Sequence, residues 1–183
     1  MTTYRIQPCT LADLRAMSLS MRAMDRSEIE GAGMKVRHAL NRIWRGSVDP
    51  RCAYVDSGLG WEIAAVWGDE GSMLEALGRA WLFTAPPVEK VPLAFFREAR
   101  KDIAQRLTMR RMLRSSVRAD YTQALRFFRL LGFTIGPAVA VGPEGVFYRE
   151  IAITRTRLSD YPSDGEQTDI ESKNETKPLA KAA

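Results

Sequence analysis

The sequence has little of what marks secreted or metal-binding proteins. Its 183 residues include only two cysteines, Cys9 and Cys52, and a single histidine, His38. So few cysteines exclude a disulfide framework and instead indicate buried thiols in a reducing compartment. Because the sequence also lacks CxxC and HxxxH spacings, we expect no zinc site or other metal site.

Long apolar stretches are also missing. No segment approaches the roughly 18 consecutive apolar residues that a membrane-spanning helix needs. The N-terminus, MTTYRIQPCT, lacks the basic start and apolar core of a signal peptide. We therefore expect no membrane span and no secretion by a signal peptide.

Charge is distributed unevenly along the chain, whose formal net charge is +5. Residues 159–183 contain more acids than bases, and their only large apolar side chains are those of Tyr161, Ile170 and Leu179. Such a segment buries too little apolar surface to offset the entropy lost on ordering. The sequence therefore predicts one folded domain over residues 1–158 and a disordered, acidic tail over 159–183.

Strand and helix patterns alternate along the body. Helices are predicted over 10–24, with Thr10 as N-cap, and over 34–45, 92–107 and 120–131, with Asp120 as N-cap of the last. Strands are predicted over 4–7, 52–55, 61–66, 79–83, 109–117, 134–141 and 146–154. Helices between the middle strands favour parallel pairing there, while hairpins favour antiparallel pairing near the ends. The pattern predicts an α/β (α+β) domain with a central mixed sheet flanked by helices.

This order of elements resembles the GCN5-related N-acetyltransferase (GNAT) fold over nearly the whole body. The segment 124–133, ALRFFRLLGF, resembles the last-helix motif of that superfamily. The resemblance implies a site for acetyl-CoA, in which the backbone of Leu82, Phe83 and Thr84 would pair with the pantetheine arm. The same motif also suits an ordinary amphipathic helix that ends at Gly132.

The loop that would hold the coenzyme A phosphates departs from the family pattern. Family members carry glycines there, which let the backbone approach the pyrophosphate. Here residues 85–92 read APPVEKVP, and no glycine occurs between Gly78 and Gly132. Three prolines remove N–H donors, and Glu89 adds a negative charge. We therefore expect a degenerate site with weak or no binding of coenzyme A, so that no cofactor is required.

The catalytic side chains of the family also change. Alignment on the Leu-Gly-Phe ending places the tyrosine that often serves as general acid at Phe128, which cannot donate a proton. The family's asparagine near the helix start falls at Tyr121. Glu62, on a predicted strand, remains the candidate general base acting through a water molecule, the alternative being an exposed strand position. His38 is interpreted as a helix-surface residue, with a role as general base as the alternative.

A narrower resemblance concerns bacteriophages. The segment 79–84, RAWLFT, is followed by a proline-containing linker, a helix rich in Arg and Lys, and the 124–133 motif; this succession resembles the internal virion protein A family of short-tailed bacteriophages. The segment 21–30, MRAMDRSEIE, is similar to an early helix of related phage proteins. The resemblance implies a virion-associated protein, found in the host cytoplasm or the virion, that is not an enzyme.

Three functions follow from these observations. The first is a non-enzymatic phage protein that acts through contacts with virion proteins, host proteins or nucleic acid. The second is an active N-acetyltransferase that transfers acetyl from acetyl-CoA to an amine of a host protein or small molecule. The third is a nucleic-acid-binding accessory protein whose basic patch contains Arg110, Arg111 and Arg114. Ordinary solvation of a basic surface is the alternative explanation of these arginines.

Overall fold

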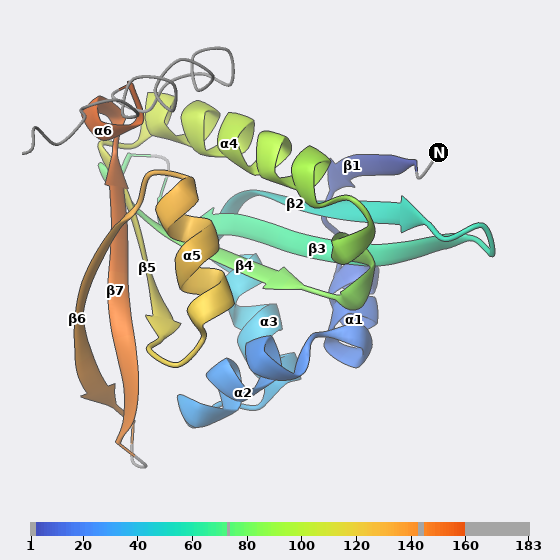
Figure 1. The fold of residues 1–183 in the computed structure, drawn as a ribbon, viewed down its shortest axis with the longest axis horizontal. Coiled ribbons are helices and arrows are strands. Elements are labelled where there is room, and N and C mark those ends of the chain that lie inside the picture. The colour runs from blue at the N-terminus through green and yellow to red at the C-terminus, as the bar shows by residue number, and fades with distance from the viewer. Residues whose placement is uncertain (1–2, 73, 143–144, 160–183) are drawn as a thin grey trace, which may run out of the picture.

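The structure, a computed structural model, describes residues 3–72, 74–142 and 145–159. Nearly all of the predicted tail, residues 160–183, therefore lies outside the described residues, and its disorder stays a prediction. Among the helices that the structure describes, none is long and apolar enough to cross a membrane. The described chain forms one sheet with helices on both faces (Figure 1).

The sheet is mixed, as the sequence predicts. In spatial order its strands are β1 (Tyr4–Pro8), β2 (Ser47–Asp56), β3 (Trp61–Glu70), β4 (Leu77–Thr84), β5 (Met112–Arg118), β7 (Val146–Thr154) and β6 (Thr134–Val141). Only β4 and β5 pair in parallel; every other neighbouring pair is antiparallel. The parallel pair requires a crossover, which the helix between the two strands supplies.

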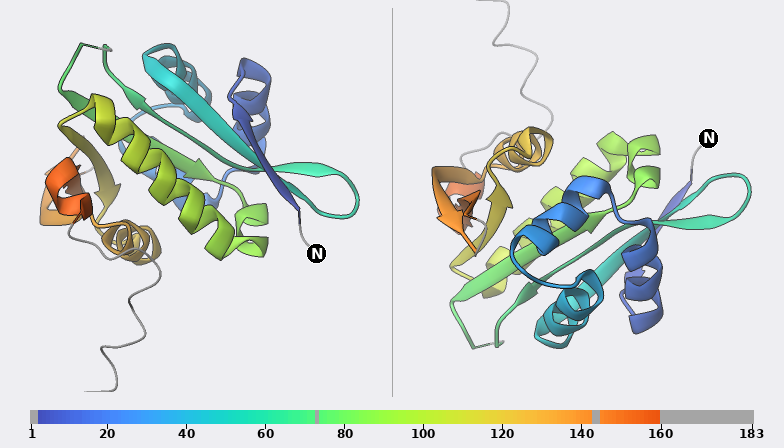
Figure 2. Two further views of the ribbon diagram at one scale, coloured as in Figure 1. Left: turned by 90° about the horizontal axis from the view of Figure 1, so that it is seen from above. Right: turned by 90° about the horizontal axis from the view of Figure 1, so that it is seen from below.

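Helices cover the two faces unequally (Figure 2). On one face lie α1 (Leu11–Ser20), α2 (Ala23–Gly31) and α3 (Val36–Arg45); on the other lie α4 (Pro92–Met109) and α5 (Thr122–Leu130). The remaining elements are the 3₁₀ helix η1 (Pro86–Lys90) and the short α6 (Arg155–Ser159). Alternate strand residues consequently enter different cores: Trp81 and Phe83 pack among α1 and α3 side chains, whereas Leu113 and Val117 pack among those of α4 and α5.

The helix predicted over 10–24 is interrupted. Its start is as predicted, because Thr10 forms a capping box in which the Asp13 carboxylate accepts from the Thr10 N–H at 2.7 Å. At Met21 and Arg22, however, ψ is 139° and 147°, so α1 ends at Ser20 and α2 begins at Ala23. The apolar periodicity continues across the break, so the sequence pattern does not show it. The break brings the Arg22 N–H within 3.0 Å of the Thr84 carbonyl on β4.

The predicted N-cap of the last helix is wrong. Tyr121 occupies that position and makes no side-chain capping bond. Asp120 lies one residue further out, and its carboxylate instead accepts from the Arg118 guanidinium at 2.5 Å. The predicted end of the helix is confirmed, since Gly132 follows it with a φ of 95°, a left-handed conformation that suits glycine.

A buried ionic cluster ties α4 to β3. Asp69 on β3 is 1% exposed and accepts hydrogen bonds from Arg106 and Arg110, which are 5% and 2% exposed. Arg106 also donates to the carbonyl oxygens of Val48 and Asp49, at 3.0 and 2.9 Å. Asp69 is thus the carboxylate that the two guanidinium groups share, and Arg106 has a second ion pair with Asp102 at 2.6 Å.

Replacing Asp69 should therefore destabilise the fold severely. We expect Asp69→Ala to lower the free energy of unfolding by about 3–5 kcal/mol, because two buried arginines lose their shared partner. The measurement is urea unfolding followed by circular dichroism. Glu70→Gln, on the same strand but in a loose 3.9 Å contact with exposed Arg79, is the control and should change stability by less than about 1 kcal/mol. Similar losses in both variants would contradict this role of Asp69.

Candidate functional site

The candidate site lies where β4 and β5 part. The two strands pair only from Leu77–Met112 to Arg79–Arg114, after which they diverge (Figure 1). The divergence leaves a cavity of about 620 Å³, bordered by both strands and by residues of α2, α3 and α5. A volume of this size suits a small-molecule ligand.

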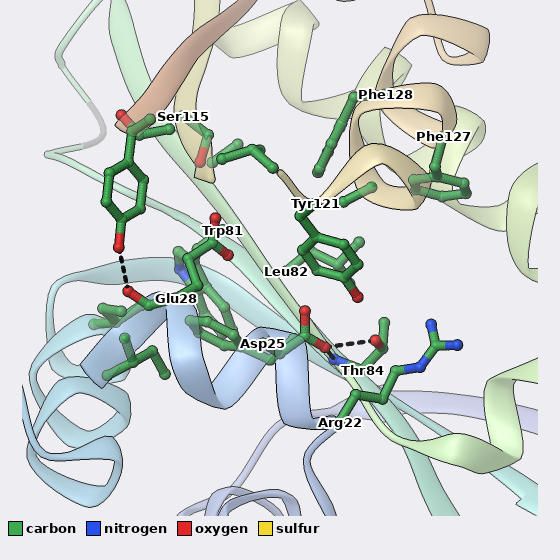
Figure 3. Close-up of a pocket in the computed structure, with 18 of the residues that line it drawn as sticks. Arg22, Asp25, Glu28, Trp81, Leu82, Thr84, Ser115, Tyr121, Phe127 and Phe128 are labelled. Atoms are coloured by element: carbon green, nitrogen blue, oxygen red, sulfur yellow. Dashed lines mark hydrogen bonds between the residues drawn. The ribbon is translucent and has the colours of Figure 1, made fainter. Parts of the chain in front are cut away.

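Two carboxylates of α2 bind the ends of the parting strands, and Figure 3 shows the contacts of the first, Asp25. Asp25 accepts from the backbone N–H and the hydroxyl of Thr84, at the end of β4, at 2.9 and 2.6 Å. Glu28, three residues further along α2, accepts from the backbone N–H of Arg118, at the end of β5, at 2.7 Å. Tyr148 donates to the Glu28 carbonyl at 2.7 Å, which ties the helix to β7 as well. One helical turn thus connects both strands across the cavity.

Burial changes the acidity of the cavity's titratable groups. Burial raises the pKa of Glu28 from 4.5 to about 7, against the lowering effect of the Arg118 N–H. Burial also raises the pKa of Asp25, although hydrogen bonds from Thr84 oppose it. For Tyr121, burial and the nearby Asp25 raise the pKa to about 12. Burial therefore favours the protonated form of the Glu28 carboxyl group, and Tyr121 keeps its proton at neutral pH.

The three residues predicted to hold the pantetheine arm all line the cavity. The Ala85 N–H bonds to Ala64 on β3, so by strand alternation Thr84 and Leu82 present their backbone groups to the opposite, cavity side. On that side the Thr84 N–H bonds to Asp25, and its carbonyl accepts from Arg22. Both Thr84 groups are thus already used. Because the β4–β5 register ends at Arg79 and Arg114, Leu82 is the remaining β4 residue whose backbone faces the cavity without a strand partner among the described residues.

The loop after β4 is folded on itself. Residues 86–90 form η1, in which the Val88 N–H bonds to Ala85 O and the Val91 N–H bonds to Val88 O, both at 3.1 Å. Glu89 lines the cavity and forms an ion pair with Arg22. With these donors used and three prolines lacking them, the loop does not fit a pyrophosphate group.

The predicted candidates for acid–base chemistry lie in different places. Glu62 is exposed, pairs with Lys90 at 3.5 Å and is not among the residues lining the cavity. His38 is exposed on α3 and is also outside the cavity. Phe128 and Tyr121 do line it. The structure therefore brings neither Glu62 nor His38 to the site that contains Phe128.

Sequence reasoning missed Asp25 and Glu28. Their signal was present, because acids three residues apart share one face of a helix. What the sequence could not show is that this face points at the ends of two strands that lie far away along the chain.

The predicted basic patch is wrong as a unit. Arg110 is 2% exposed and donates to Asp69 and to the carbonyl oxygens of Ser72 and Glu75. Arg111 is exposed, and Arg114 is exposed and lines the cavity. The strand pattern predicted around these residues did not reveal that Arg110 precedes β5 and turns into the ionic cluster.

The cysteines are buried and free, as expected. Their sulfur atoms lie within 4.8 Å of each other and of a carboxylate oxygen of Asp13. Both oxygens of Asp13 already accept hydrogen bonds, one from Tyr54 at 2.5 Å and the other from Thr10 at 2.7 Å. Asp13 therefore serves the helix cap and the β2 contact.

Comparison with known proteins places the fold. No protein-family model matches the chain, and no curated protein matches it in sequence. Solved structures do match: spermidine N-acetyltransferase from Vibrio cholerae in complex with CoA and spermine is 12% identical, with a TM-score of 0.57 over 85% of this chain and 98% of that one. The ribosomal-protein-S18-alanine N-acetyltransferase from Escherichia coli is 15% identical, with a TM-score of 0.57 over 90% and 98%.

A GNAT-family acetyltransferase from Streptococcus pneumoniae is similar in the same way, at 13% identity and a TM-score of 0.53 over 83% of this chain and 99% of that one. Identities this low carry over the fold and not the activity. The chain therefore has the GNAT acetyltransferase fold, as the order of its elements predicts.

The raised pKa of Glu28 predicts how stability depends on pH. Between pH 4.5 and about 7 the native state binds a proton that the unfolded state releases, so this group makes stability fall as pH rises through that window. Glu28→Gln should remove the contribution of this group to the pH dependence of the free energy of unfolding. The variant should therefore gain stability relative to the wild type as pH rises. Urea unfolding at several pH values measures the difference. Glu30→Gln, on the same helix but exposed, is the control; a constant difference between Glu28→Gln and wild type would contradict the assignment.

Proposed function

We propose that the chain uses the acetyltransferase fold as a binding scaffold, without catalysing acetyl transfer, and that it acts through contacts with proteins or nucleic acid in a phage virion or its host. The first part of this proposal rests on the hydrogen bonds of Thr84. Its N–H and carbonyl face the cavity; the N–H is bonded to Asp25 on α2, and the carbonyl accepts from the N–H of Arg22, just before α2.

A pantetheine arm would compete with α2 for this strand edge. In the family that the sequence resembles, β4 backbone groups pair with the arm. Here Asp25 and Arg22 make those bonds within the chain, and Asp25 bonds the Thr84 hydroxyl as well. Binding the arm would first break these contacts and leave a buried carboxylate without partners, which is costly.

The loop after β4 and the side chains available for acid–base chemistry also argue against acetyl transfer. The η1 loop has no glycine and directs Glu89 to the cavity. Phe128 cannot act as a general acid, and Tyr121 reaches the cavity from the N-terminal end of α5 rather than from its middle. Acetyl-CoA supplies an activated acyl group when bound, but these residues offer it little support.

The phage assignment rests on the resemblance of 79–84 and 124–133 to the internal virion protein A family. Those segments form β4 and α5 with the turn after it, which are two walls of the cavity. A chain that keeps these walls and loses the phosphate loop is what we expect of a fold retained for binding. We place the protein in the host cytoplasm or the virion.

A second candidate function is an active N-acyltransferase, and Glu28 favours it. A carboxyl group with a pKa of about 7 in a cavity suits a general base that takes a proton from an amine. In this candidate α2 would have to release Thr84 before the donor binds. A third candidate, nucleic-acid binding, is retained only as one form of the contacts proposed above.

Titration with acetyl-CoA separates the first two candidates. For the wild type we expect no heat of binding at millimolar acetyl-CoA, while the Vibrio cholerae spermidine N-acetyltransferase serves as the positive control. Asp25→Ala, which frees the Thr84 N–H, should bind weakly if occupancy of the strand edge is the cause. Micromolar binding by the wild type, lost in Leu82→Pro and accompanied by acetylation of an amine, would overturn the proposal and establish the enzyme.

The virion assignment has its own test. In particles of the encoding phage purified by density gradient, we expect mass spectrometry to detect the chain in constant ratio to the capsid protein. The same lysate after removal of particles is the control. A chain found only in the particle-free fraction would contradict a place in the virion.

A further inference from the structure

Three exposed arginines line the cavity near the end where β4 and β5 still pair. Arg79 and Arg114 are direct cross-strand neighbours on the two parallel strands, and Arg42 lies on α3. All three line the cavity. Because Arg79 alternates with Ala80 along β4, it shares a face with Trp81, which packs among α1 and α3 residues. Arg114 alternates with Leu113, which packs toward α4 and α5, so Arg114 faces the α3 side too.

This arrangement is poorly neutralised by the protein. Arg79 has a loose contact of 3.9 Å with Glu70. Neither Arg42 nor Arg114 has an ion pair or a side-chain hydrogen bond with another described residue. Like charges directly opposite each other on neighbouring strands destabilise a sheet. Stability alone therefore does not explain why Arg79 and Arg114 stand side by side.

We propose that this end of the cavity is a binding site for the phosphate group of a small phosphate monoester, with Arg42, Arg79 and Arg114 as its ligands. A guanidinium fork pairs with two phosphate oxygens at once, and a dianionic group suits three positive charges, of which only Arg79 has an ion-pair contact, with Glu70, among the described residues. The remainder of the ligand extends along the cavity toward Tyr121, Phe127 and Phe128, whose rings line its other end. The site needs neither coenzyme A nor catalysis.

The surroundings favour a small ester over a nucleic-acid strand. The arginines open into a cavity of about 620 Å³, which has the size of a small-molecule site. Four carboxylates line the same cavity and would repel a chain of phosphates more strongly than a single phosphate group: Asp25, Glu28, Glu70 and Glu150. In addition, burial of Arg110 removes the continuous basic stripe that a backbone would follow.

The test uses phenyl phosphate as the probe, with phenol as the ligand that lacks the phosphate. Calorimetric titration of the full chain should show binding of phenyl phosphate and none of phenol. Arg42→Gln/Arg114→Gln should raise the Kd by about tenfold or more, because the phosphate loses two charged hydrogen-bond donors. The matched control is Arg45→Gln/Arg111→Gln, which removes two exposed arginines outside the cavity and should leave the Kd within about twofold of the wild type, since solvent and salt screen exposed charges that lie far from the ligand.

A second readout does not depend on the ligand. Arg114→Gln alone should leave the urea midpoint of the free protein unchanged or raise it, because it removes the repulsion from Arg79. A drop in that midpoint would assign Arg114 a structural role and overturn the proposal. So would equal affinity of wild type and Arg42→Gln/Arg114→Gln for phenyl phosphate. Binding of a single-stranded oligonucleotide without binding of phenyl phosphate would replace it with a nucleic-acid surface.

Discussion

The parting of β4 and β5 determines what the rest of the molecule can do. Two parallel strands that pair over only three residues diverge beyond that point. The backbone groups on the two edges that face each other then have no strand partner. Buried N–H and carbonyl groups need partners, so each edge must find one within the chain or in a ligand. In this protein α2 supplies two such partners. Its Asp25 accepts from Thr84 at the end of β4, and its Glu28 accepts from Arg118 at the end of β5. The same contacts decide which part of the cavity remains open to a ligand.

Placing carboxylates at these positions has an electrostatic consequence. Asp25 and Glu28 lie one helical turn apart in partly dry surroundings, and burial shifts the pKa of both upward. The protein separates these acids from its most buried bases, since Arg106 and Arg110 pair with Asp69 on β3, and Arg106 also pairs with Asp102 on α4. The buried cluster around Asp69 thus contributes to stability, while a separate pair of carboxyl groups, Asp25 and Glu28, with raised pKa values, lines the cavity.

The cavity has two ends of opposite character. Carboxylates and a tyrosine stand where the strands have diverged, and arginines stand where they still pair. A coenzyme A thioester finds neither a glycine loop nor a free Thr84 edge at the first end. At the second end, Arg42 and Arg114 have no ion pair with another described residue, and Arg79 has a loose contact with Glu70. The fold therefore has a cavity in which the strand edge at Thr84 is occupied by the chain itself and the arginine side chains are only partly neutralised.

The sequence by itself determined the mixed sheet, the Thr10 capping box, the missing glycine loop and the loss of a hydroxyl at Phe128, because each depends on local periodicity or on residue type. Only the tertiary structure decided that the first helix breaks at Arg22, that Arg110 is buried, and that Asp25, Glu28 and Arg114 face one cavity. These outcomes depend on contacts between residues up to 120 positions apart, as for Glu28 and Tyr148. A local sequence pattern does not specify which distant strand end a side chain will contact.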